Sequence, residues 1–342
     1  LFEAYERSLP HCREVIASSC PRNQGESDAS YERRLKSVYV DSSRFLLPAA
    51  ALANVGMTVN ARILEHLISK MLSHPLAEVR NIGEEIKKVA VAEVPTLVKY
   101  ANENPYLAGQ VEVNLMSEPP NPPGDDFCHL VDYTSDGEER FLTSLLYRSG
   151  MSDFAACSQQ VGGMSDVDKH TLMDSALAKM GRFDYPPREA EYIFYTFDTV
   201  MDQGAYYEVK RHRMMTQSPQ QLTCSLGYAT PNLFRQAGFE ADYRSVMSDT
   251  MAVYEKVKSV APLAAAYLVP NGFYRRVLLT MNLREAFHFI QIRSAPGAHY
   301  SVRLLAQKMA DQIRQVHPRL GSYLRVNPNE TWQSVLQDNF VV

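Results

Sequence analysis

Several signals that would assign a function are missing from this 342-residue sequence. It has no glycine-rich phosphate loop, no G-x-S-x-G motif and no C-x-x-C pair, so the commonest signatures of nucleotide binding and nucleophilic catalysis are absent. Its five cysteines are scattered without metal-ligand spacing, which predicts free thiols, no metal site and a reducing cytoplasmic location. No uninterrupted apolar run approaches the length of a membrane span, so we expect no association with a membrane.

An excess of basic charge is also missing. The chain carries 35 basic and 39 acidic residues, a formal net charge of -4, which argues against a broad electrostatic surface for nucleic acid. The same balance leaves room for a local basic pocket that binds a phosphate. The length exceeds one ordinary hydrophobic core, so we expect two domains or two copies of one unit.

Apolar periodicity predicts helices in the first third and a sheet further on. The stripe Val59, Ile63, Leu67 and Met71 predicts a helix from Val55 to Lys70, and a similar pattern runs from Pro75 to Val98. The aromatic and β-branched run Glu191–Met201 predicts a strand. Further helices are expected over Glu138–Arg148, over Asp166–Met180 and, largely, from Ala241 onward. The predicted class is α+β, without the βαβ rhythm of a doubly wound sheet.

An internal repeat is the most informative feature of the sequence. The segment Arg44–Lys70 resembles Ala266–Ile292 at one offset of 222 residues. This offset pairs Pro48 with Pro270, Asn60 with Asn282, Arg62 with Arg284, and His66 with His288. We therefore predict a duplicated unit: residues 1–116 are the latter half of a first copy, 117–131 a proline-rich linker, and 132–342 a nearly complete second copy.

Two clusters of polar residues could carry chemistry. The first is the duplicated pattern N-x-R-x-x-x-H at Asn60 and Asn282, for which a solvated or interface helix face is the alternative. The second is the run KRHRMMT over residues 210–216, whose cationic side chains predict a phosphate or pyrophosphate pocket. A merely solvated basic patch is the alternative there. Cys224 lies near this run, and we interpret it as a buried, inert thiol.

The order of these motifs resembles the flavin-dependent thymidylate synthases over essentially the whole chain. Arg211, His212 and Arg213 match the family's RHR motif, and Thr216 stands in its serine position. The following segment PQQLTCSLGY departs from the family pattern, because the Glu, Ser and Arg that hold the nucleotide have no clear counterparts. The L/V-P and N-x-R spacings match in both copies, as does Arg293 in the second.

The resemblance implies an α+β fold of helices packed on an antiparallel or mixed sheet, and a flavin site built from both copies. The residues that would bind FAD are Arg211, His212, Arg213, Met214, Asn282, Arg284 and His288, with Asn60, Arg62 and His66. Arg44, Arg293 and Thr216 would bind a dUMP-like pyrimidine nucleotide, and Arg293 would be the catalytic contact to the uracil. NADPH and methylenetetrahydrofolate would be co-substrates, and two tandem chains would form a four-unit assembly.

Three functions stay open at this point. The first is flavin-dependent methylation of dUMP to dTMP. The second is a diverged paralogue that keeps the fold, with or without the flavin, but whose synthase activity is lost or changed. It is favoured because Ala266 and Met71 each stand where the family has an arginine. A purely structural pairing module is the third, and the retained RHR and N-x-R motifs argue against it.

Overall fold

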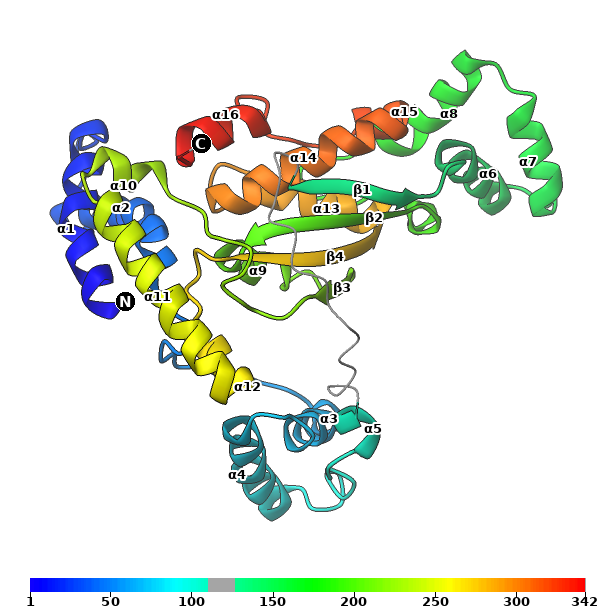
Figure 1. Cartoon of the computed structure of the whole chain (residues 1–342). Coiled ribbons are helices and arrows are strands. Elements are labelled where there is room, and N and C mark those ends of the chain that lie inside the picture. The colour runs from blue at the N-terminus through cyan, green and yellow to red at the C-terminus, as the bar shows by residue number, and fades with distance from the viewer. Residues whose placement is uncertain (110–126, 342) are drawn as a thin grey trace. The chain divides into compact units, whose positions relative to one another are not determined.

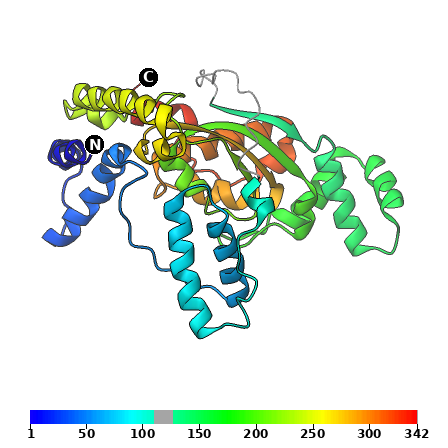
Figure 2. The same ribbon diagram turned by 60° about the horizontal axis from the view of Figure 1, so that its bottom comes forward.

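The computed structural model, drawn in Figures 1 and 2, describes residues 1–109 and 127–341. These residues divide into two compact units. Unit 1 comprises Leu1–Leu47, Pro122–Ser248 and Pro270–Val342; unit 2 comprises Pro48–Asn121 and Asp249–Val269. Each unit is assembled from segments that are distant in the sequence. The predicted boundaries 1–116, 117–131 and 132–342 divide copies rather than units and stay a prediction. Most of the predicted linker, residues 117–126, lies outside the described residues.

Unit 1 is built around a four-stranded antiparallel sheet of order β1-β2-β4-β3. Its strands are β1 Cys128–Tyr133, β2 Phe194–Asp202, β3 Thr216–Pro219 and β4 Tyr274–Asn282. The strand predicted over Glu191–Met201 is confirmed from Phe194 onward, after the short 3₁₀ helix η3 Arg188–Tyr192. The predicted α+β class is confirmed, and the sheet is antiparallel in the described residues.

The two central strands bury one face in the main core, whereas the other face mixes polar side chains with Phe194, Val200 and Leu278. Tyr195, Phe197, Val277 and Leu279 are fully buried at alternate positions, as the two-residue period of a strand requires. Figure 1 shows α13 Leu283–Arg293 and α14 Tyr300–Val316 beside this sheet, and their apolar side chains belong to the same core. The prediction that the chain is largely helical from Ala241 onward is confirmed, but it did not include β4, which pairs with β2 on one side and β3 on the other.

The remaining helices of unit 1 lie before, between and after the strands. They are α1 Phe2–Ser19, α2 Asp28–Ser43, η1 Arg44–Leu46, α6 Gly137–Ser149, α7 Phe154–Gly162, α8 Asp166–Leu177, α9 Gln203–Val209, α10 Asn232–Gln236, α15 Pro318–Ser322 and α16 Trp332–Asn339. The helices predicted over Glu138–Arg148 and Asp166–Met180 are confirmed as α6 and α8. Helix α11 Glu240–Val260 begins in unit 1 and ends in unit 2. None of the described helices is both long and apolar enough to cross a membrane.

Unit 2 is a small helical unit. Its elements are α3 Ala61–Leu72, α4 Ala77–Glu93, α5 Pro105–Gly109, α12 Pro262–Ala265 and η4 Ala266–Leu268, with the end of α11. Its apolar core comprises Ile68, Leu72, Ala90, Val98 and Ala101. This core is much smaller than that of unit 1, so α3 and α4 have little apolar surface to pack against.

Two helix predictions in unit 2 need correction. The helix predicted from Val55 begins only at Ala61, because Asn60 caps it by accepting a hydrogen bond from the Ile63 backbone N–H at 3.0 Å. The predicted apolar stripe is also wrong: Val59 and Ile63 are 36% and 51% exposed. The buried side of α3 is instead the neighbouring stripe that ends in Ile68 and Leu72. The helix predicted over Pro75–Val98 is confirmed only over α4.

Candidate functional site

A cavity of about 290 Å³ lies in unit 1 where β4 ends and α13 begins. Its lining residues are Tyr185, Glu191, Met214, Asn282, Arg284, Glu285 and His288. Met214, Asn282, Arg284 and His288 are among the predicted flavin-binding residues. The structure therefore brings together residues that are about 70 positions apart in the sequence, from the RHR turn and from the N-x-R-x-x-x-H motif.

Asn282 organises one wall of the cavity. It is the last residue of β4, paired with Phe194, and its side-chain oxygen accepts a hydrogen bond from the Glu285 backbone N–H at 2.8 Å. This N-cap starts α13, so Arg284 and Glu285 occupy its first turn and His288 its second. The motif is thus a strand end, a cap and a helix start, not one face of a continuous helix.

Arg284 is held against the cavity wall by two acceptors. Its Nε donates to the Pro186 carbonyl and its Nη1 to Glu191, each at 3.0 Å. Hydrogen bonds from Arg188, and then from Arg284, hold the pKa of the Glu191 carboxyl below its usual range. A guanidinium has five N–H donors, so Arg284 keeps donors for a ligand while its position is fixed.

His212, the central residue of the RHR motif, is buried between the side chains of an arginine and a glutamate. The Arg293 Nε donates to its Nε2 at 2.9 Å, and its Nδ1 lies 2.9 Å from Glu285. An arginine nitrogen is always a donor, so Nε2 is the acceptor and Nδ1–H donates to the Glu285 carboxylate. His212 therefore connects the start of α13 to its end.

The Arg293 guanidinium already forms hydrogen bonds with other side chains of this chain. Besides His212, its guanidinium donates to Glu208 of α9, whose other oxygen lies 3.2 Å from Arg211. Arg293 is largely buried, whereas Arg211 is mostly exposed. Within residues 1–109 and 127–341, the exposed Arg213 has no hydrogen-bond or ion-pair partner. Arg213 is thus the cation of the RHR motif that is most available to an anionic ligand.

His288 completes the ring cluster beside the cavity. Its ring centroid lies 5.5 Å from that of His212 and 5.7 Å from that of Tyr185. Burial lowers the pKa of His288 below its ordinary value, and the nearby Arg293 acts in the same direction. The neutral imidazole is therefore favoured, and it can accept or donate a hydrogen bond at the cavity.

The other predicted site residues lie elsewhere. Thr216 begins β3, and Arg44 of η1 forms an ion pair with Asp41 of α2 at 3.3 Å. Neither Thr216 nor Arg44 lines this cavity. Asn60, Arg62 and His66 belong to unit 2, where Asn60 caps α3 and the other two side chains are exposed. Their participation in a site with residues of unit 1 stays a prediction.

Sequence reasoning missed the acidic residues of this site. Glu208, Glu191 and Glu285 accept hydrogen bonds or ion pairs from the arginines and from His212. For two of them, the position in the sequence is a signal that could have predicted their role. Glu208 lies one helical turn before Arg211, and Glu285 occupies the first turn of α13, where a carboxylate is favoured. In the described ranges, no group of three or more His, Cys, Asp or Glu could hold a metal ion.

The residues present fit part of a flavin nucleotide. Arg284 and Asn282 supply hydrogen-bonding groups, Tyr185 supplies an aromatic ring, and the unpaired Arg213 is suited to a phosphate. The cavity is too small to enclose a whole dinucleotide. Arg213, on the exposed turn beside the cavity, would hold a phosphate of the part that the cavity does not enclose.

Comparisons with known proteins place this geometry in context. Residues 3–96 and 129–319 match the family described as thymidylate synthase complementing protein. A UPF0159 protein of Chlamydia muridarum is 29% identical over 97% of the chain and 65% of its own length. The chain spans 62% to 70% of the length of three such UPF0159 relatives.

Two further proteins are similar over shorter or less similar ranges. A flavin-dependent thymidylate synthase of Sulfolobus acidocaldarius is 36% identical over 25% of the chain and 30% of its own length. The crystal structure of the flavin-dependent thymidylate synthase of Helicobacter pylori, complexed with FAD and dUMP, matches 59% of the chain and 100% of its own. That match has a TM-score of 0.42 and 17% identity.

Proposed function

Because the chain belongs to the thymidylate synthase complementing protein family, we propose that it binds FAD at this cavity and methylates a dUMP-like pyrimidine nucleotide. One observation carries the proposal: Met214, Asn282, Arg284 and His288 line one cavity beside the turn that holds the RHR motif. Flavin-dependent thymidylate synthases and a structure with FAD and dUMP are among the similar proteins, which supports the choice of ligands.

Each residue has a role that its contacts suggest. Arg213 binds a phosphate, because its charge has no partner within the described chain. Arg284 orients the flavin ring from a fixed position, and the neutral His288 offers a hydrogen bond without adding charge. Arg293 contacts the pyrimidine with the donors that Glu208 and His212 leave free. FAD supplies reversible two-electron chemistry when bound, with NADPH as reductant and methylenetetrahydrofolate as the carbon source.

We also propose that the chain is a tandem duplication. Three pairs of elements recur at the expected offsets: η1 with η4 and α3 with α13 at 222 residues, and α4 with α14 at 223. Asn60 and Asn282 cap their helices through the same hydrogen bond. Backbone bonds recur as well, since Asn271 donates to Leu47 and, symmetrically, Ala49 to Val269. Two such chains would then supply four units to an assembly.

A second candidate function is a diverged paralogue that binds flavin without efficient synthesis. The engagement of Arg293 by Glu208 favours it, because a nucleotide would have to compete with an internal carboxylate for this guanidinium. Ala266 and Met71 stand where the resemblance expects arginines, so cationic groups are also fewer. In this case FAD binds, but dUMP binds weakly.

Flavin titration tests the site. Arg213→Ala should weaken FAD binding at least tenfold, since a charge-assisted hydrogen bond contributes on the order of 1.5–3 kcal/mol. Arg33→Ala is the matched control, because this exposed arginine of α2 donates only to a backbone carbonyl. An Arg213→Ala protein that binds FAD as tightly as the unchanged chain would contradict the assignment.

Turnover separates the two candidate functions. Release of tritium from C5-labelled dUMP, with NADPH and methylenetetrahydrofolate present, supports the synthase. A protein that binds FAD but neither releases tritium nor binds dUMP at micromolar concentration supports the diverged paralogue. A protein that binds no flavin contradicts both.

A further inference from the structure

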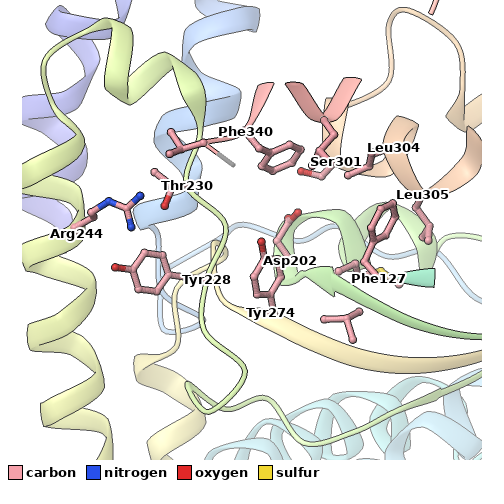
Figure 3. A pocket seen from close by; sticks show the side chains of 14 residues that line it. Phe127, Asp202, Tyr228, Thr230, Arg244, Tyr274, Ser301, Leu304, Leu305 and Phe340 are labelled. Atoms are coloured by element: carbon pink, nitrogen blue, oxygen red, sulfur yellow. The ribbon is translucent and has the colours of Figure 1, made fainter. Parts of the chain in front are cut away.

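A second cavity, of about 330 Å³, lies at the opposite end of strands β2 and β4. The strand register pairs Asp202 with Tyr274 at this end, and Phe194 with Asn282 at the end where the flavin cavity begins. Its lining residues are Phe127, Val200, Met201, Asp202, Tyr228, Thr230, Arg244, Tyr274, Ser301, Leu304, Leu305, Leu336, Phe340 and Val341 (Figure 3). No residue is shared with the flavin cavity, so this is a separate site.

A buried acid is the central polar group of this cavity. Asp202 is 3% exposed, and its Oδ1 accepts from the Ala205 backbone N–H at 2.8 Å, which caps α9. Figure 3 shows Asp202 near Tyr274 and Ser301, which come from β4 and α14. Burial raises the pKa of Asp202, and the nearby His299 acts in the opposite direction. In the described chain no lysine or arginine forms an ion pair with Asp202. A buried carboxylate that lacks such a partner needs strong hydrogen-bond donors to remain ionised.

Three hydroxyl groups in the cavity lack hydrogen-bond partners within the described residues. The Ser301 Oγ is buried without a partner, and neither the hydroxyl of Thr230, which is 5% exposed, nor that of Tyr274 has one. The cap uses one lone pair of Asp202, which leaves acceptor capacity on its carboxylate. Buried polar groups are rarely left unpaired, so the polar floor of this cavity is suited to a ligand that brings N–H donors.

The apolar walls of the cavity and the side that carries Arg244 indicate what the rest of the ligand should look like. Phe127, Leu304, Leu305 and Phe340 form apolar walls, of which two are flat aromatic rings. Arg244 lies on the more exposed side, where its guanidinium also contacts Glu240 at 2.9 Å. Apolar walls with a few fixed polar groups are typical of sites for planar small molecules.

We propose that this cavity binds a small planar heterocycle that donates a ring N–H and an exocyclic amino group to Asp202 and directs an anionic group toward Arg244. Guanine and the 2-amino-4-oxopteridines both carry a ring N–H next to an exocyclic amino group, and we call this pair the donor edge. Its two donors match the two oxygens of a carboxylate. The proposal does not depend on flavin binding, because it involves the opposite end of the strands.

Binding of two defined probes tests the proposal on the full chain. We expect pterin-6-carboxylate or guanosine monophosphate to bind, measured by calorimetry, and the one that binds identifies the source of the donor edge. Lumazine-6-carboxylate replaces the amino group with an oxygen, so it should bind at least about tenfold more weakly than the pterin. Absence of binding by both probes, or equal binding of pterin and lumazine with no binding of guanosine monophosphate, would overturn the proposal.

Variants locate the bound probe. Asp202→Asn should weaken binding by about tenfold or more, whereas asparagine still caps α9. Asp153→Asn is the matched control, because Asp153 caps α7 through the same hydrogen bond of 2.8 Å outside this cavity. Arg284→Gln, in the flavin cavity, should leave probe affinity unchanged. Unchanged binding by Asp202→Asn, or loss of binding in Arg284→Gln, would show that the probe binds elsewhere.

Discussion

The segments 52–60 and 274–282 occupy equivalent positions of the proposed duplication but adopt different structures. Residues 274–282 form β4, paired on both sides by β2 and β3, and Leu279 is fully buried. Residues 52–60 have no regular structure, and the counterpart of Leu279, Met57, is 57% exposed. Within residues 1–109 the structure contains no strand that could pair with residues 52–60. A strand is stable through its neighbours more than through its own propensity.

The following helices show where the two copies agree. Both α3 and α13 begin directly after an asparagine cap, with the same bond to the backbone N–H three residues later. A cap is a local interaction, so it forms in either surrounding. The comparison therefore separates local signals, which recur, from tertiary pairing, which occurs in one copy. Four matched pairs of substitutions test this difference between the copies.

The largest difference should come from the apolar pair Leu279 and Met57. Leu279→Ala leaves a cavity in the main core and should lower the free energy of unfolding by about 2–5 kcal/mol. Met57→Ala should change it by less than about 0.5 kcal/mol, because the side chain is mostly exposed. Urea unfolding of the full chain, followed by circular dichroism, measures both. Equal losses would mean that residues 52–60 are packed in solution as β4 is.

The second pair compares the arginines of the N-x-R motif. Arg284→Gln should weaken FAD binding by about tenfold, because two acceptors already fix this guanidinium at the cavity. Arg62→Gln should have a smaller effect, since the exposed Arg62 has no described partner that would fix its position. Flavin fluorescence quenching gives both affinities. A larger effect of Arg62→Gln would transfer the main flavin contact to the first copy.

Much of this site could be predicted from the sequence, for reasons that these pairs make clear. The RHR and N-x-R motifs are local patterns that carry the family resemblance, and this resemblance selected Met214, Asn282, Arg284 and His288 before their cavity was known. The acidic partners could not, because the contact of Glu208 with Arg293 joins α9 to the end of α13. A contact between residues 85 positions apart leaves no periodic trace in one sequence.

The fold shows the same limit. Helices α6 and α8 and strand β2 follow from local patterns and were predictable. Strand β4 was missed, because its sequence resembles residues 52–60 and the two segments take different structures. The start of the helix predicted from Val55 was wrong for a local reason. Asparagine is favoured at an N-cap and disfavoured inside a helix, so α3 begins only after Asn60.

The third pair tests the caps, where the copies should behave alike. Asn60→Ala and Asn282→Ala should each destabilise their helix by about 1 kcal/mol, because each removes one bond to an otherwise unpaired N–H. Hydrogen exchange of the first turns of α3 and α13, read by mass spectrometry, measures the two losses separately. A loss confined to α13 would show that α3 does not depend on its cap.

The smallest effect should come from His288 and its counterpart His66. Burial holds the pKa of His288 below its ordinary value near 6.5, whereas the His66 side chain is exposed. As the pH falls below 6.5, the unfolded chain binds the proton at position 288 before the folded chain does. The contribution of His288 to stability is therefore present above that pH and is lost below it.

His288→Asn should make the decline of unfolding free energy between pH 7 and 5 shallower, and His66→Asn should leave the decline unchanged. Other buried histidines contribute equally in both variants, so the difference between the two curves isolates position 288. A steeper decline in His288→Asn would mean that the folded protein binds this proton more tightly than the unfolded chain, with Glu285 outweighing burial.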